Sequence, residues 1–233
     1  MDAVTSLAKP WNPKANNTVQ AIAVTNGKVF VGGDFTTIGG QTRNRLASID
    51  VINGLVTNWD PNADGTISAL ATSGSTVYAG GWFATIGGLP RHYIAAMDGT
   101  TGQVTAWNPN ANYGILTLTV NGNKVYAGGM FTSIGGQTRN RLAAIDALTG
   151  QATPWNPNAN DRVNSVVVKG STVYAGGNYI SIGGQTRNYI AALDASTGLA
   201  LPWNPNADSN TNTIAVNGNI VYAGGDFSNI GGQ

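Results

Sequence analysis

Carboxylates and a single histidine are the residues in this sequence that could carry out acid–base chemistry. The eleven acidic residues are all Asp, and His92 is the one histidine. A glycosidase needs two carboxyl groups that flank the scissile bond. Asp34 and Asp226 occupy equivalent positions and would lie side by side if the chain closes into a ring. No neighbouring residue type would raise their pKa, so we expect no enzyme, with glycan hydrolysis as the least favoured alternative.

One acidic loop could bind a hard cation. Asp60, Asn62 and Asp64 match the first half of a calcium-binding loop, whose ligands are oxygens. Ala71 stands where such a loop needs a bidentate Glu, and the same loop in the other copies is mostly neutral. Side-chain-capped turns are the favoured interpretation. We therefore predict no metal and no cofactor, with this loop as the alternative.

The positions discussed above recur along the chain. The sequence WNPNAN at 155–160 has four relatives, and 48 residues separate each tryptophan from the next. A fixed period of this size indicates stacked supersecondary units. We divide the single domain, residues 1–233, into repeats 18–65, 66–113, 114–161 and 162–209, followed by an incomplete copy made of 210–233 and 1–17.

Each repeat is predicted to contain four short strands. In the third copy, apolar and β-branched residues predict strands over 115–120, 124–129, 141–147 and 151–155. The intervening turns are Asn-Gly at 121–122, Ile-Gly-Gly at 134–136 and Thr-Gly at 149–150. Pro157 ends the last strand because proline cannot donate to a ladder. Four strands per repeat of this length are typical of a propeller blade.

We therefore predict an all-β fold, a five-bladed β-propeller of four-stranded antiparallel blades. Five complete copies would need about 240 residues, and the chain has 233. The shortfall corresponds to residues 138–144, most of one third strand. The fifth blade is therefore expected to be composite, with two inner strands from 210–233 and the outer strand from 1–17. A second copy could add a strand to the unfilled edge.

Large and charged side chains at fixed repeat positions are interpreted as structural. Sugar stacking is the alternative for the tryptophans, but identical placement in every copy favours wedges between blades. The arginine fork suits carboxylates or carbonyls, and the recurring Asp suits turn capping. Anion binding is the alternative for the arginines. The tryptophans are Trp11, Trp59, Trp107, Trp155 and Trp203; the arginines are Arg43, Arg91, Arg139 and Arg187; the aspartates are Asp2, Asp50, Asp98, Asp146 and Asp194.

Positions that differ between copies are the candidates for binding. If a ligand is bound, we expect it on the face that these residues form, with Trp82 as an aromatic anchor. A tolerant surface is the favoured interpretation of these positions, and ligand binding is the alternative. The residue after each Gly-Gly pair is Asp34, Trp82, Met130, Asn178 or Asp226, and a second variable position holds Arg45, Tyr93, Arg141 or Tyr189.

Composition excludes several classes of function. Charged residues make up 10% of the chain and the net charge is +1, with no basic run, so no nucleic-acid partner is expected. Apolar runs are strand-sized and too short to span a membrane. The first residues do not form a signal peptide. Few charges, no Cys and many Asn, Thr and Gly suit an exported bacterial protein, secreted or at the cell surface.

The segment NKVYAGGMFTSIGGQTRNRLAAIDALTG (123–150) and copies such as 27–50 resemble the bacterial delta-sixty β-propeller repeat family. The resemblance implies a propeller in an exported or cell-surface protein, and it brings no catalytic residues. We predict a non-catalytic interaction or structural module that could self-assemble through its incomplete blade. A carbohydrate-binding propeller that takes glycans is the alternative, and a laboratory-made consensus protein also fits the similarity of the copies.

Overall fold

The computed structural model describes residues 11–233, and the described chain is all-β. Each of four repeats forms a three-stranded antiparallel sheet. The first contains β1 (Val19–Thr25), β2 (Lys28–Gly33) and β5 (Leu46–Asp50), and the second β6 (Ile67–Ser73), β7 (Thr76–Gly81) and β10 (Ile94–Asp98). The third contains β11 (Ile115–Asn121), β12 (Lys124–Gly129) and β15 (Leu142–Asp146), and the fourth β16 (Val163–Lys169), β17 (Thr172–Gly177) and β20 (Ile190–Asp194).

A two-stranded unit, β21 (Thr211–Asn217) and β22 (Ile220–Gly225), follows the fourth sheet. A small hairpin also projects from each of the four complete repeats, around the predicted Gly-Gly turn. These hairpins are β3 (Thr37–Ile38) with β4 (Gln41–Thr42), β8 (Thr85–Ile86) with β9 (Leu89–Pro90), β13 (Ser133–Ile134) with β14 (Gln137–Thr138), and β18 (Ser181–Ile182) with β19 (Gln185–Thr186).

The predicted fourth strand is reduced to one bridge per blade. In the third copy Ala152 pairs with Ile145, and the N–H of Thr153 donates to Ala144 O at 2.8 Å. Pro154 then removes the next donor. The indole of Trp155 leaves this sheet and inserts toward the next blade. The prediction of a fourth strand over 151–155 was therefore wrong in extent, although the segment lies at the predicted outer position.

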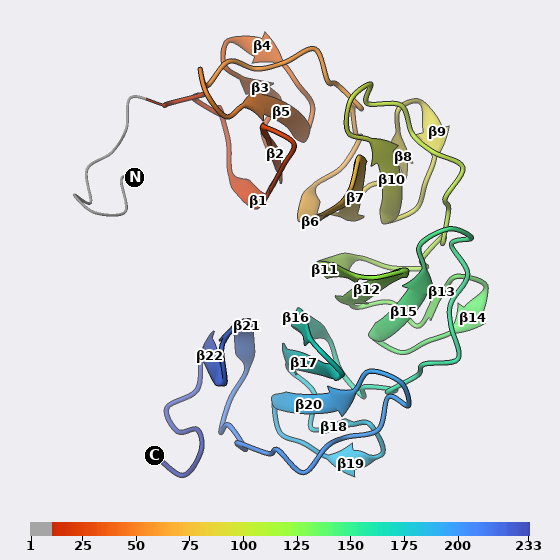
Figure 1. Cartoon of the computed structure of the whole chain (residues 1–233), viewed down its shortest axis with the longest axis vertical. Coiled ribbons are helices and arrows are strands. Elements are labelled where there is room, and N and C mark those ends of the chain that lie inside the picture. The colour runs from red at the N-terminus through yellow and green to blue at the C-terminus, as the bar shows by residue number, and fades with distance from the viewer. Residues whose placement is uncertain (1–10) are drawn as a thin grey trace.

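The inner strands β1, β6, β11, β16 and β21 lie around an arc that is open between β21–β22 and β1–β2 (Figure 1). The predicted closed ring of five blades is therefore not formed by the described strands. The reason is that neighbouring blades pack in a similar way at all four junctions. The rotation from one blade to the next, applied four times, does not bring β21 beside β1. The composite fifth blade needs residues 1–10, including Asp2, which lie outside the described residues.

The core lies between neighbouring blades. Its largest buried side chains include Trp59, Tyr126 and Phe83. Glycine in the second strand allows the next blade to approach, as at Gly80, where an added Cβ would lie 2.5 Å from Ile115 Cγ2 and 3.2 Å from Leu118 Cδ1. Such spacing is too short for any Cβ, so glycine at this position fixes how closely two blades pack.

Candidate binding surface on the inner rim

The five variable residues after the Gly-Gly pairs lie at the same end of every inner hairpin. The N–H of Asp34 donates to Thr18 O at 2.9 Å, and that of Trp82 donates to Thr66 O at 2.8 Å. Because the same bond recurs in every copy, these residues line one rim of the arc, here called the inner rim. It consists of Asp34, Trp82, Met130, Asn178 and Asp226.

Asp34 is engaged by protein donors. Gln20 Nε2 donates to its Oδ2 at 2.8 Å, and the hydroxyl of Thr66, in the next blade, donates to its Oδ1. Arg45 donates to its main-chain carbonyl. Asp34 follows β2 whereas Asp226 follows β22, at the opposite end of the arc (Figure 1). The expected side-by-side placement of the two carboxylates was therefore wrong for the described structure.

An aromatic cluster occupies the rim between the second and third blades. Trp82 and Tyr113 meet edge to face, with ring centroids 5.2 Å apart, and Tyr93 lies 6.1 Å from Tyr113. Gly114 lies under the indole, since an added Cβ would be 2.7 Å from Trp82 Cζ2. Both Trp82 and Tyr113 are exposed. The sequence analysis did not single out Tyr113. The signal was present, because the equivalent positions 65, 161 and 209 hold Gly, Asp and Ser and so vary between copies.

The second variable position has strained backbone in every complete copy. Its φ is positive, as at Tyr93 (65°) and Tyr189 (64°), a region that non-glycine residues rarely adopt. Arg141 donates from this position to the carbonyl of Met130, as Arg45 does to Asp34. Tyr189 lines a depression of about 600 Å³ between the fourth blade and the segments 205–208 and 229–232. The two sets of variable residues thus meet at the rim.

A polar network that sequence reasoning also missed surrounds Asn178. Arg162 Nε and Asn164 Nδ2 donate to its Oδ1 at 2.8 and 3.0 Å. Asn164 also reaches Asn212 Oδ1 of the next blade at 3.4 Å, and Asn212 Nδ2 lies 3.2 Å from Asp226 Oδ1. These amides connect two rim residues across a blade junction.

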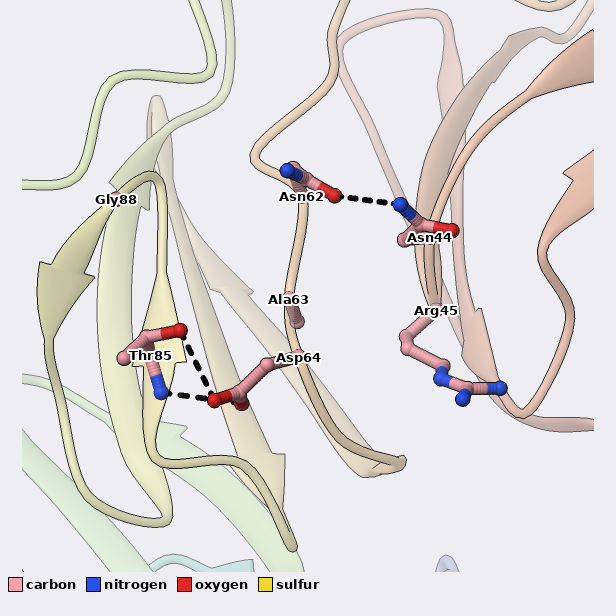
Figure 2. Close-up of a pocket in the computed structure, with 7 residues that line it drawn as sticks. All are labelled: Asn44, Arg45, Asn62, Ala63, Asp64, Thr85 and Gly88. Atoms are coloured by element: carbon pink, nitrogen blue, oxygen red, sulfur yellow. Dashed lines mark hydrogen bonds between the residues drawn. The ribbon is translucent and has the colours of Figure 1, made fainter.

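Polar grooves separate neighbouring blades near the rim. Figure 2 shows the first, a pocket of about 370 Å³, where Asn44 Nδ2 donates to Asn62 Oδ1 at 2.8 Å. Asn62 has φ 53°, which asparagine tolerates better than most residues. The same side-chain pair occurs as Asn140–Asn158 at 2.7 Å and Asn188–Asn206 at 2.9 Å. His92 replaces the first Asn in the second copy, and it makes no such bond with Asn110.

The oxygens of the candidate calcium loop do not converge. Asn62 points toward Asn44, whereas Asp64 points away from it toward Thr85 (Figure 2). Asp60 lies 3.8 Å from Arg43. Partial burial would raise the pKa of Asp64, but the N–H groups of Thr85 and Ala84 and the Thr85 hydroxyl lower it overall. Within residues 11–233 no three His, Cys, Asp or Glu side chains gather as a metal site.

The recurring arginines bind carbonyls of the outer segment. Arg139 donates from Nη1 to Thr138 O at 2.8 Å and from Nη2 to Thr153 O at 2.6 Å. Arg43, Arg91 and Arg187 donate to the equivalent carbonyls. Each arginine thereby ties the outer segment to the small hairpin, where a fourth strand would otherwise supply ladder bonds.

The recurring tryptophans and aspartates meet at the blade junctions. Trp107 Nε1 donates to Asp146 O at 3.0 Å and Trp155 Nε1 to Asp194 O at 2.9 Å. Trp59, Trp107 and Trp155 are buried, while Trp11 and Trp203, in the two terminal segments of the arc, are partly exposed. The Asp carboxylates cap the turns that follow, as at Asp98, where N–H groups of Thr100 and Thr101 donate to Oδ1.

Comparison with known proteins identifies a family. The family model described as "Outer membrane protein assembly factor BamB" matches residues 10–229. No curated protein sequence matches. Residues 11–233 contain no helix long and apolar enough to cross a membrane.

Solved structures of similar fold include designed and natural proteins. The computationally designed Ika8 protein has a TM-score of 0.51 and 17% identity, over 92% of this chain and 69% of that chain. A chain of the Mitotic Checkpoint Complex has a TM-score of 0.58 and 14% identity, over 84% of this chain and 53% of that one. The designed Ika4 protein has a TM-score of 0.48 and 21% identity, over 69% and 86%.

Proposed function

Because the chain belongs to the family of the outer membrane protein assembly factor BamB, we propose that it is a non-catalytic propeller module that binds other proteins. In this proposal it is an exported bacterial protein that acts at the envelope or the cell surface. The narrower resemblance to delta-sixty repeats stays a prediction.

The inner rim carries the proposal. Its residues sit on backbone that repeats with the same hydrogen bonds, yet each blade presents a different side chain: carboxylate, indole, thioether or amide. A repeated scaffold fixes its positions, and variation on it supplies a surface that distinguishes one partner from another. Arg45, Tyr93, Arg141 and Tyr189 extend this surface outward.

Site-specific photo-crosslinking tests the proposal. A photoreactive amino acid is placed at Trp82, on the rim, or at Ile52, which is exposed in an outer turn. Each protein is irradiated with a solubilised outer-membrane protein fraction. We expect discrete protein adducts from position 82 and none from position 52. Equal adducts from both positions, or none from either, would contradict a rim that binds proteins.

Contacts between copies form a second part of the proposal. β22 pairs with β21 on one edge, and no strand of the described chain pairs with its other edge. An unpaired edge presents N–H and C=O groups that another chain can complete by strand addition. Lysine substitutions along 220–225 should then abolish any such association, since charged edge residues oppose pairing.

The aromatic cluster favours carbohydrate binding as a second candidate. Exposed aromatic rings present apolar faces to which sugar rings can pack, and Trp82, Tyr113 and Tyr93 gather at one junction. On a glycan array we expect binding that Trp82→Ser or Tyr113→Ser abolishes. Leu148→Ser, in an exposed outer turn, serves as the matched control. Binding that is the same in all four proteins would exclude the cluster as a sugar site.

A further inference from the structure

Three of the four blade junctions contain the same polar groove. The first is the pocket of Figure 2, of about 370 Å³, where Asn44 and Arg45 lie on one side of Asn62 and Thr85 lies on the other. The third and fourth junctions repeat it, with volumes of about 360 and 600 Å³. Two hydrogen-bonded asparagines, here called the asparagine pair, line each groove: Asn44–Asn62, Asn140–Asn158 and Asn188–Asn206.

Each asparagine pair keeps one acceptor and one donor for another molecule. In the first pair Asn44 Nδ2 donates to Asn62 Oδ1, which uses one amide atom of each residue. Within residues 11–233, neither Asn44 Oδ1 nor Asn62 Nδ2 has a hydrogen bond to another protein group, and the same two atoms are free in the other pairs. The groove therefore offers a carbonyl oxygen and an amide nitrogen, as the edge of a strand does.

These two groups match the main chain of an extended peptide. A peptide N–H can donate to the free oxygen, and a peptide C=O on the same edge can accept from the free nitrogen. Every second residue of a strand directs its N–H and C=O to the same edge, at a repeat of about 6.7 Å. An asparagine pair spans a similar length, because its free atoms lie at opposite ends of the bonded amides (Figure 2).

The residue beside each asparagine pair varies, although the pair does not. The position after the first asparagine holds Arg45, Arg141 or Tyr189, and each of these lines its groove. Because the main chain is common to all peptides, the same amide pair can hold any extended segment, while the varying neighbour contacts its side chains. Strand-like recognition of peptides divides affinity and specificity in this way.

We propose that the three grooves bind extended segments of partner proteins through main-chain hydrogen bonds to the asparagine pairs. The inference deepens the proposed function and rests on it, since it names an extended main chain as what the module recognises. The second junction is not such a site, because His92 stands in place of the first asparagine.

The experiment selects random linear peptides, displayed on phage, on the full wild-type chain. Peptides that also bind the triple variant Asn44→Ala/Asn140→Ala/Asn188→Ala are discarded. We expect peptides that need an asparagine pair, each weakened about 3–10-fold by one of the single substitutions, the value of a hydrogen bond. Asn123→Ala, in an exposed turn away from the grooves, is the matched control. A selection that returns no pair-dependent peptide would overturn the inference, as would sugar binding that the triple variant loses in its place.

N-methylation of the peptide gives a measurement that a purely structural role of the pair would not change. Methylating successive amides of a peptide that needs Asn44 removes one main-chain donor at a time. At one position the loss should equal that of Asn44→Ala, and the two changes together should cost no more than either alone, because both remove the same bond. Additive losses at every position would contradict main-chain recognition.

The second junction allows a gain of binding. Its variable residue is Tyr93, which corresponds to Tyr189 of the fourth groove. Peptides lost in Asn188→Ala should bind again to Asn188→Ala/His92→Asn, which places an asparagine opposite Asn110 and beside a tyrosine. A folded double variant that does not regain them would be evidence against the inference.

Circular dichroism checks that each variant stays folded. We expect this because the second junction forms without an asparagine pair, with Tyr78 and Trp107 packed at a centroid distance of 5.1 Å. Absence of pair-dependent peptides from a protein that still gives crosslinks from position 82 would overturn this inference alone. Pair-dependent peptides from a protein without those crosslinks would instead count against the rim as the protein-binding surface.

Discussion

The indole Nε1 of Trp59 donates to the main-chain carbonyl of Asp98 at 2.8 Å, across the junction between the first two blades. The carboxylate of the same Asp98 accepts N–H groups from Thr100 and Thr101 and so holds the turn that carries this carbonyl. Trp59 also packs edge to face on Phe30, with centroids 4.9 Å apart. One tryptophan thus joins the outer segment of its own blade to a turn of the next.

Trp107→Ala should destabilise the fold by about 3–5 kcal/mol, the range for truncating a buried Trp. Trp107 is buried, packs on Tyr78 and donates to Asp146 O. Trp203→Ala is the matched control, because Trp203 packs on Tyr174 but is partly exposed. Urea unfolding followed by circular dichroism should show the larger loss for Trp107. Equal losses would contradict the junction role of the buried indoles.

Asp194 should make stability depend on pH in the acid range. Hydrogen bonds from the Ser196 hydroxyl and from Thr197 lower its pKa to about 2, whereas an unfolded Asp has a pKa of about 3.9. The carboxylate therefore stabilises the fold fully above about pH 5, and this contribution is lost as the pH falls toward 2.

The measurement compares urea midpoints of the wild-type protein and Asp194→Asn from about pH 2 to 6. The difference should be constant above about pH 5 and shrink toward pH 2. Ser196→Ala should move the acid loss to higher pH, because the serine hydroxyl is the largest cause of the lowered pKa. A difference that does not vary with pH would contradict the capping role of this carboxylate.

His92→Asn should stabilise the protein by about 0.5–1.5 kcal/mol, the net value of a hydrogen bond. It would recreate the Asn–Asn pair that three other junctions contain, such as Asn140–Asn158 at 2.7 Å. Asn110→Ala on the His92→Asn background should cancel the gain, since the partner is then removed. Thermal unfolding of the single and double variants tests this, and a neutral His92→Asn would show that the pair contributes nothing.

Arg187→Lys should destabilise the fold by about 1–3 kcal/mol, because an ammonium cannot replace both arms of the fork and a carbonyl loses its partner. Arg187 donates to Thr186 O at 2.8 Å and Leu201 O at 2.9 Å. Carbonyl acceptors carry no net charge, so the loss should be nearly the same at low and high salt. Arg43→Lys, beside Asp60, is the comparison. A strongly salt-dependent loss at Arg187 would contradict carbonyl binding.

The sequence alone was sufficient for the blades and their inner strands. The predicted strand over 124–129 agrees with β12. The turn before it lies one residue later than predicted, because Asn121 pairs with Lys124 and the two turn residues are Gly122 and Asn123. These features are local, because a few adjacent residues determine both the alternation of side chains in a strand and the residue types of a turn. The period of 48 residues likewise required one supersecondary unit per copy.

Tertiary structure decided how the units are joined. Whether 151–155 becomes a strand depends on where Trp155 inserts, and that depends on a carbonyl at Asp194, 39 residues away. The meeting of Trp82, Tyr93 and Tyr113 depends on Gly114, which belongs to the next blade. The curvature of the arc depends on how closely the inner strand of the next blade packs against the glycine in the second strand of each blade. The sequence repeat shows that these contacts are equivalent. The angle between neighbouring blades, however, follows from side-chain packing in three dimensions, so the open arc could not be predicted from the number of copies.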